Sequence, residues 1–144
     1  MARDVVARKL DSLQRCLQRV QDRVPASVEA LQADLDVQDV LTLNLTRAVQ
    51  ICVDLAMHLL ATRDLPPPAT MGEAFDQMQQ TGMLDAMLAR RMKQSVGFRN
   101  IAVHAYDSID WHIVHAIASR HLEDFRDFAR VIHTYMAEGG TGHE

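Results

Sequence analysis

VQDVLTLNLTRAVQICVDLAMHLLATR, residues 37–63, has the pattern of a helix whose apolar side chains cover most of its circumference. A helix that is apolar nearly all round is buried by neighbours on several sides. We therefore predict a central helix from about Val37 to Arg63, with Asp36 as its N-cap. Its apolar residues are Val40, Leu41, Leu43, Leu45, Ala48, Val49, Ile51, Val53, Leu55, Ala56, Leu59 and Leu60.

Helical patterns also lie on both sides of this segment. Before it, apolar residues recur in steps of four and three from Val6 to Val24, which predicts one helix that Pro25 ends. A short helical piece is expected at 27–35. After three prolines at 66–68, the predicted helices span about 70–80, 84–98 and 108–136.

Local signals mark the ends of the helix at 70–80, and no segment alternates as a β-strand would. Thr70 and Glu73 have the spacing of a capping box, and Gly82 follows as a stop. The sequence therefore predicts an all-α fold, an up-and-down bundle of four to five helices in one domain of residues 1–137. Residues 138–144 have nothing to bury and are predicted to form a disordered tail.

Composition excludes several classes of protein. Of the 144 residues, 48% are apolar and 24% charged, which is the balance of a globular domain. Cys16 and Cys52 lie in apolar periodic segments without a CxxC spacing, so we expect buried thiols rather than a disulfide framework or a zinc site. No apolar run approaches the roughly 20 residues of a membrane span, and the first residues lack the plan of a signal peptide. We expect no membrane association and a cytoplasmic location.

Charge is distributed unevenly along the chain. The net charge of −4 argues against non-specific nucleic-acid binding over the whole surface. Residues 83–106 instead carry four basic residues against one acidic residue. Arg90, Arg91 and Lys93 in this stretch are candidates for contacts with RNA phosphates, and a solvated helix face explains them equally well.

Residues 97–110, GFRNIAVHAYDSID, place polar groups among small and apolar residues. On a helix, Asn100 and His104 are neighbours on one face, whereas Arg99 lies about 140° from His104 around the axis. One straight helix does not aim both side chains at one atom. A second subunit at a two-fold interface is a natural way to bring them together.

Arg99, Asn100 and His104 suit the cleavage of an RNA phosphodiester. Arginine supplies a permanent cation whose fork fits a phosphate and its transition state. Histidine moves protons near neutral pH, and the asparagine can hold either group in place. The sequence offers no carboxylate cluster for a metal, so we expect cleavage without metal or cofactor. By spacing alone, an arginine and a histidine more often have structural roles.

The pattern Arg99-x4-His104-x-Tyr106 resembles the R-x4-H-x-Y signature of the HepT family, a branch of the HEPN superfamily. The residues that flank the motif agree, and the asparagine directly after Arg99 matches the polar residue that the superfamily prefers. Residues 47–60 resemble the central helix of that family. The resemblance covers about residues 5–135.

This resemblance implies a homodimeric ribonuclease toxin of a type VII-like toxin–antitoxin pair. Arg99 and His104 would be the catalytic pair at the cleft between the subunits. The partner would be a minimal nucleotidyltransferase antitoxin of the MntA type, which silences the toxin by transferring AMP to Tyr106. The sequence matches the motif at each of its positions.

Other polar residues have two interpretations. Asp54 and His58, four residues apart on the central helix, either support the site or form a polar stripe that is satisfied within the bundle or at a dimer seam. The sequence favours neither. His112, His115 and His121 lack the framework of a zinc motif, so we interpret them as surface or interhelical histidines and predict no metal site.

The predicted reaction is attack of the 2′-hydroxyl of RNA, with tRNA among the candidate substrates, on the adjacent phosphorus. His104 would act as general acid or base, Arg99 would stabilise the charged phosphorane, and Asn100 would orient them. The alternative is a non-catalytic helical module that binds a nucleotidyltransferase partner and uses the same residues to hold a nucleotide or substrate.

Overall fold

The computed structural model describes residues 2–142 and places them in seven α-helices and one short 3-10 helix, with no strand in this range. The elements are α1 (Ala2–Arg23), α2 (Val28–Gln32), α3 (Leu35–Leu60), α4 (Met71–Gln80), α5 (Ala86–His104), η1 (Tyr106–Ser108), α6 (Trp111–Arg120) and α7 (Leu122–Gly142). The prediction of an all-α fold is confirmed.

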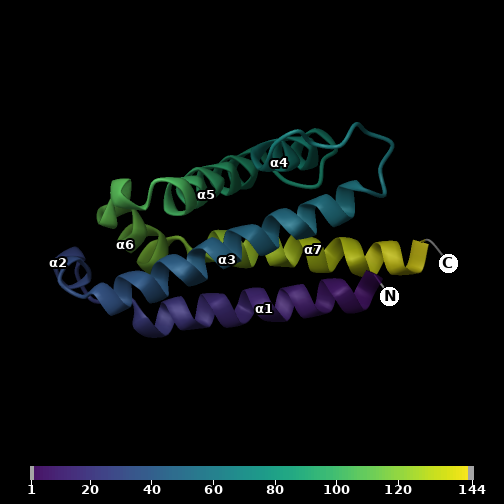
Figure 1. The fold of residues 1–144 in the computed structure, drawn as a ribbon. Coiled ribbons are helices and arrows are strands. Elements are labelled where there is room, and N and C mark those ends of the chain that lie inside the picture. Colours follow the sequence, from purple (N-terminus) through teal and green to yellow (C-terminus); the bar gives the residue numbers. More distant parts are fainter. Residues whose placement is uncertain (1, 143–144) are drawn as a thin grey trace.

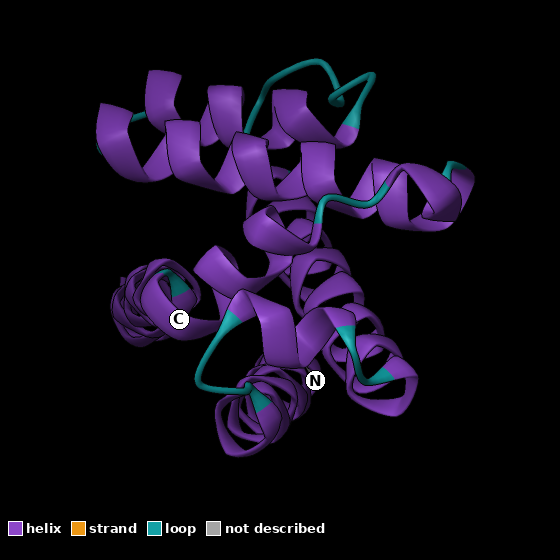
Figure 2. Cartoon of the chain, turned by 90° about the vertical axis from the view of Figure 1, so that its left-hand side faces the viewer, coloured by secondary structure: helices purple, strands orange, loops and turns teal. Residues whose placement is uncertain are grey.

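The four long helices, α1, α3, α5 and α7, run alternately up and down the bundle (Figure 1). The short helices α2 and α6 pack together at one end, whereas the loop before α4 lies at the other end. Figure 2 looks along the bundle from the end that holds α2 and α6, and shows helices joined by short loops. This topology brings the end of α5 to the same end of the bundle as the start of α3.

α3 is the centre of the core. By length and composition it is the one helix among the described residues that could cross a membrane, but it packs against α1, α4, α5 and α7, and 56% of its apolar window is buried inside the bundle. Phe75 of α4 meets Phe128 of α7 edge to face, with ring centroids 5.6 Å apart. Burying side chains of this size contributes about 1.5–3 kcal/mol each. The side chains of α3 without exposed surface are Leu41, Leu45, Ala48, Val49, Cys52 and Ala56.

Helix caps confirm one prediction and correct another. The Thr70 hydroxyl accepts from the backbone N–H of Glu73 (3.2 Å), as the capping-box spacing predicts. The prediction of Asp36 as the N-cap of α3 was wrong. Asp34 caps this helix, because its side chain accepts from the backbone N–H of Val37 (3.1 Å). The side chain of an N-cap residue accepts from the backbone N–H three residues later. Because α3 begins at Leu35, Asp34 and not Asp36 stands at the capping position.

The single helix predicted at 108–136 is two helices. α6 ends at Arg120 and α7 begins at Leu122, with His121 between them. The apolar spacing continues across this point, so periodicity gives no sign of the break. The break keeps α6 packed on α2 while α7 returns along the bundle.

α7 also continues to Gly142, so residues 138–142 are helical here rather than the predicted disordered tail, while 143 and 144 lie outside the described residues. Each residue that extends an existing helix adds one hydrogen bond, whereas the first turn of a new helix fixes several residues for one hydrogen bond.

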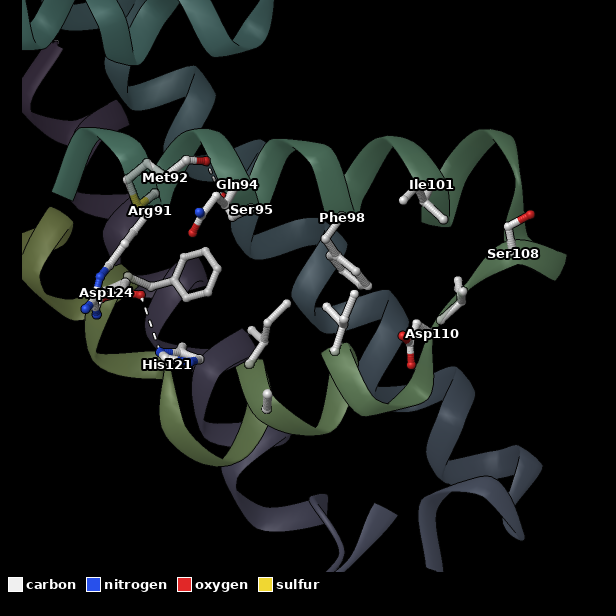
Figure 3. Close-up of a pocket in the computed structure, with 15 residues that line it drawn as sticks. Arg91, Met92, Gln94, Ser95, Phe98, Ile101, Ser108, Asp110, His121 and Asp124 are labelled. Carbon is white, nitrogen blue, oxygen red and sulfur yellow. Dashed lines mark hydrogen bonds and ion pairs between the residues drawn. The ribbon is translucent and has the colours of Figure 1, made fainter. Parts of the chain in front are cut away.

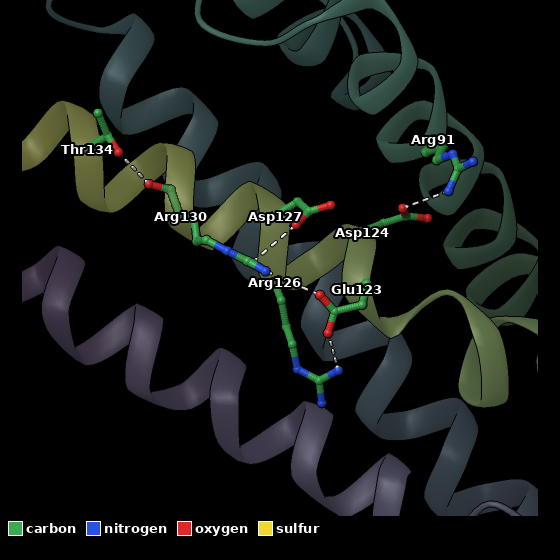
Figure 4. Close-up of polar contacts among 7 residues, drawn as sticks. All are labelled: Arg91, Glu123, Asp124, Arg126, Asp127, Arg130 and Thr134. Atoms are coloured by element: carbon green, nitrogen blue, oxygen red, sulfur yellow. Dashed lines mark hydrogen bonds and ion pairs between the residues drawn. The ribbon is translucent and has the colours of Figure 1, made fainter.

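The charged side chains of α7 pair with one another (Figure 4). Glu123 accepts from Arg126 (3.0 Å) and from Arg130 (3.2 Å), and Asp127 also accepts from Arg130 (3.2 Å). Arg126 reaches across to α1, where it donates to the side chain of Gln21 (2.7 Å). The ion pairs thus lie within α7, and the hydrogen bond from Arg126 joins this helix to α1 at the surface of the bundle.

The two cysteines are free and buried, as predicted. Burial raises the pKa of the Cys16 thiol, although Arg47, Arg15 and Arg19 nearby act in the opposite direction. Both thiols are therefore held in the protonated, unreactive form.

Candidate active site at the end of α5

α5 carries the motif on its last turns. Asp85 caps the start of the helix by accepting from the backbone N–H of Leu88 (2.8 Å). The helix then continues to His104, beyond the end near Phe98 that the sequence predicts. Ala105 leaves the helical conformation (φ −146°, ψ 54°), and the chain turns directly into η1. The motif therefore lies at a helix end, with its tyrosine in the turn that follows.

Asn100 and His104 lie on an exposed stripe of α5. At about 100° per residue, they share one face of the helix with Arg90, Lys93 and Gly97, and all five residues are exposed. A Cβ atom added at Gly97 meets nothing within 4 Å, so the middle of the stripe is open. The stripe extends for about 21 Å along the helix axis.

Arg99 lies beside this stripe and is half-buried, and no carboxylate of the described residues pairs with it. Its Nη1 donates to Oδ1 of Asn100 (3.1 Å). Its Nε is buried and has no hydrogen-bond partner among the described residues. An unpaired buried donor costs about 1–3 kcal/mol. The guanidinium therefore retains donors for an external anion, and its bond to Asn100 draws it toward the face that carries His104.

His104 is exposed, and its side chain makes no hydrogen bond or ion pair with the described residues. About 140° still separate it from Arg99 around the axis of an unbroken helix. Within one protomer the two side chains do not face a common atom. Around the helix axis, Asn100 lies between Arg99 and His104, and among the described residues its side chain hydrogen-bonds to Arg99 only.

Tyr106 contacts a part of the chain that is distant in sequence. Its hydroxyl donates to Oδ1 of Asp39 on α3 (2.9 Å), and its ring meets Trp111 edge to face at 6.2 Å. Partial burial, together with the hydrogen bond and charge of Asp39, raises the pKa of Tyr106. The nearby hydroxyl of Thr42, which has no hydrogen-bond partner among the described residues, acts in the opposite direction. The phenol is therefore neutral near pH 7 and still 41% exposed.

Asp54 and His58 are not brought to the motif. Asp54 accepts from Lys9 of α1 (3.2 Å) and from Gln50 one turn earlier (3.0 Å). It lies 15 residues after Asp39, or about 22 Å further along α3. Of the two interpretations, the structure supports the polar stripe satisfied within the bundle for Asp54. A supporting role for the pair stays a prediction.

The three basic residues before the motif differ in their surroundings. Arg91 pairs with Asp124 of α7 (3.1 Å), on the side of α5 away from the exposed stripe. Lys93 pairs with Asp76 of α4 (2.9 Å) but shares the stripe with His104. Arg90 has no side-chain partner among the described residues. The structure thus aligns two of the three residues with the histidine.

An apolar groove of about 590 Å³ adjoins the motif between α5 and α6 (Figure 3). Phe98 and Ile101 line it from α5, and Ile113 and Ile117 line it from α6. Ile101 and Ile113 are 42% and 50% exposed, which is unusual for isoleucine on a single folded domain. In angle, Ile101 lies between Phe98 in the groove and His104 on the stripe.

The three histidines that lack a zinc framework each have a partner. His115 contacts the backbone carbonyl of Pro25 (2.8 Å), His112 lies 3.3 Å from Asp110, and His121 lies 3.9 Å from Asp124. Among the described residues, no group of three or more histidine, cysteine or acidic side chains could hold a metal ion.

A family model described as ribonuclease HepT-like matches residues 13–132. The chain belongs to the HepT-like family. An mRNA nuclease HepT of Shewanella oneidensis is 33% identical over 129 residues, which cover 90% of this chain and 96% of that protein. A tRNA nuclease HepT of Aphanizomenon flos-aquae is 25% identical over 132 residues, which cover 92% and 90%.

Solved structures agree with this assignment to the HepT-like family. The tri-AMPylated HEPN toxin of Shewanella oneidensis, solved in complex with an MNT antitoxin, matches with a TM-score of 0.84 and 33% identity. The match covers 91% of this chain and 98% of that one. The helical order of this HepT-like chain is therefore that of the toxin component of a solved pair.

Asp39 is the residue of this HepT-like site that sequence reasoning missed. It lies 67 residues before Tyr106, in the stretch that the apolar pattern assigned to the central helix. The signal available was weak: an exposed aspartate on the first turns of a helix that is otherwise buried.

Proposed function

We propose that this chain is an endoribonuclease toxin, cleaves RNA without a metal ion, and is silenced by a nucleotidyltransferase antitoxin that transfers AMP to Tyr106. One observation carries the proposal: Arg99 is a half-buried cation that has a neutral partner and, among the described residues, an unpaired Nε, and an exposed histidine follows five residues later on the same helix. The names of the relatives, an mRNA nuclease and a tRNA nuclease, support RNA as the substrate.

The proposed chemistry assigns one role to each motif residue. The 2′-hydroxyl of RNA attacks the adjacent phosphorus, the bond to the 5′-oxygen of the next nucleotide breaks, and a 2′,3′-cyclic phosphate remains. Arg99 stabilises the charge on the phosphorane. His104 takes the proton of the 2′-hydroxyl or gives one to the leaving oxygen. Asn100 holds the guanidinium. Because a guanidinium and an imidazole supply both charge and proton, the reaction needs no metal.

The active form is proposed to be a homodimer. Arg99 and His104 point to different sides of α5, so a second copy is needed to complete the pair. The surface that we assign to this contact is the apolar groove, with the exposed Ile101 and Ile113. Because this groove is continuous with the motif face, a two-fold dimer formed through it would bring the His104 side chains of both protomers near the axis.

Arg90 and Lys93 are proposed to contact RNA phosphates on the approach to His104, because they share its face of α5. Arg91 is not part of this path, since Asp124 neutralises it on another side.

Tyr106 is the proposed point of control. A bulky anionic group two residues after His104 would fill the cleft and repel RNA phosphate. The HEPN toxin of Shewanella oneidensis, which is tri-AMPylated and bound to its MNT antitoxin, supports this assignment. We infer a single domain spanning residues 1–137 that acts in the cytoplasm, where RNA, ATP and a partner nucleotidyltransferase are found together.

The test is cleavage of tRNA and mRNA by the purified protein in EDTA, after intact mass has shown that it carries no AMP. Wild type is expected to cut, and Arg99→Ala and His104→Ala to lose at least about 10³-fold in rate. Arg126→Ala, which removes a paired arginine on α7, is the matched control and should cut normally.

Two results contradict the proposal. If EDTA abolishes cleavage by the wild type, the metal-independent mechanism is wrong. If unmodified protein leaves all RNA intact and its expression without the antitoxin is harmless, the chain is the non-catalytic module that binds a nucleotidyltransferase and a nucleotide.

A further inference from the structure

The hydroxyl of Tyr106 already has a specific partner before any modification. It donates to Oδ1 of Asp39 at 2.9 Å, and the two residues are the only link of this kind between η1 and α3 among the described residues. The edge contact with Trp111 restricts the ring on its other side. Tyr106 and Asp39 are both exposed, so a second protein can reach the oxygen while the hydrogen bond is in place.

The phenol needs help to react. Partial burial and the neighbouring Asp39 carboxylate raise the pKa of Tyr106, so the oxygen keeps its proton near neutral pH. A neutral phenol is a poor nucleophile, and such groups are activated by an adjacent base. The base has to be within hydrogen-bonding reach of the proton that it removes.

We propose that Asp39 is the general base for the transfer of AMP to Tyr106, and that the modified chain therefore supplies a catalytic group for its own silencing. The inference rests on the proposed function. As Oη of Tyr106 bonds to the α-phosphorus of ATP, the bond from that phosphorus to the bridging oxygen breaks and pyrophosphate leaves. The phenolic proton moves to Oδ1 of Asp39.

Other titratable groups near Tyr106 are less well placed. His104 precedes it on α5, Asp107 follows it in η1, and Asp110 stands before α6, where its Oδ1 accepts from the backbone N–H of His112. Among the described residues, none of these three hydrogen-bonds to the phenolic oxygen. α6 presents Trp111, which does not titrate.

The experiment measures the modification rate by intact mass, with an MNT-type nucleotidyltransferase antitoxin that modifies the wild type, ATP and Mg²⁺. Asp39→Asn keeps the size of the side chain and removes the base. Asp36→Asn is the matched control, because it removes an exposed aspartate one turn earlier on α3. We expect Asp39→Asn to slow transfer about 100-fold, with the affinity of the two proteins unchanged, and Asp36→Asn to match wild type.

A pH profile separates a base from a merely structural residue. Without Asp39, transfer depends on phenolate formed by the solvent, whose fraction rises about tenfold per pH unit below the pKa of the phenol. The rate of Asp39→Asn should therefore climb steeply between about pH 7 and 9, while that of wild type changes much less.

Every other outcome is informative. If Asp39→Asn is modified as fast as wild type, or faster, Asp39 is not the base, although the proposed silencing at Tyr106 stands. If it is slow but has the shallow pH profile of wild type, the inference is also wrong. If wild type itself is not modified at Tyr106, the proposed control of the toxin fails and the inference fails with it. RNA cleavage is measured separately and does not depend on either result.

Discussion

α5 and α7 are both long helices that carry arginines, and the two helices differ in whether these arginines have carboxylate partners. On α7, Arg126 and Arg130 pair with Glu123 and Asp127 within the same helix (Figure 4). On α5, the one side-chain partner of Arg99 among the residues that the structure describes is the neutral Asn100, and its Nε has none there. A paired surface cation stabilises a helix slightly, whereas an unpaired, half-buried one keeps its charge for a ligand.

The same contrast exists within α5 itself. In its first half, Arg91 and Lys93 contact Asp124 and Asp76 from neighbouring helices. Among the described residues, no carboxylate pairs with Arg99 in the second half of α5. Arg91, which is paired on the side away from the exposed stripe, therefore contrasts most clearly with Arg99, and the contrast can be tested by giving or removing partners.

Of these changes, the largest loss of cleavage is expected when Arg99 is given a carboxylate partner, as the arginines of α7 have. Asn100→Asp places a carboxylate where Arg99 now donates to an amide oxygen. The pair neutralises the cation that the phosphate needs, so RNA cleavage should fall about 100-fold. Asn100→Ala removes only the hydrogen bond and should cost about tenfold. Single-turnover cleavage assays measure both, and equal losses would show that the charge of the partner is irrelevant.

The second prediction concerns the groove beside α5. Ile101→Glu places a charge on the surface that we assign to the second copy, where it would be buried without a partner. The dimer should dissociate in light scattering, and cleavage should fall about tenfold or more. Leu35→Glu, at an exposed leucine of α3, is the control and should leave both unchanged. A fully active dimer of Ile101→Glu would exclude this face.

The smallest effect is expected on α7. Arg130→Ala breaks two exposed ion pairs. Exposed pairs contribute about 0–1 kcal/mol, so the free energy of unfolding should fall by no more than that in urea titrations. Cleavage should stay within about twofold of wild type. A large loss of cleavage would mean that RNA also contacts α7, and the comparison between the two helices would no longer hold.

Much of the fold follows from patterns that act within a few residues. Apolar periodicity predicted the long helices, because one buried face repeats every three or four positions. The capping-box spacing of Thr70 and Glu73 likewise predicted the start of α4. The break at His121 was not predictable in this way, because the apolar spacing continues across it and the cause lies in how α6 packs on α2.

The candidate site shows the same limit. Arg99, Asn100, His104 and Tyr106 are close in sequence, so their chemistry and the family motif could be read together. Asp39 contacts Tyr106 across 67 residues, and a contact between distant segments leaves no local pattern. Asp54 shows this limit from the other direction. Its spacing relative to His58 favoured neither a supporting nor a structural role, and its contact with Lys9 of α1 leaves no local pattern.

Trp111 is the only tryptophan of the chain, and its ring lies edge to face with that of Tyr106. On excitation at the red edge of the aromatic absorption band, where tyrosine no longer absorbs, the fluorescence of this protein therefore comes from a single indole beside the residue proposed to carry AMP. The molecule contains its own optical reporter of that residue. We expect transfer of AMP to Tyr106 to change this emission, so that the proposed modification could be followed in real time without a dye or a label.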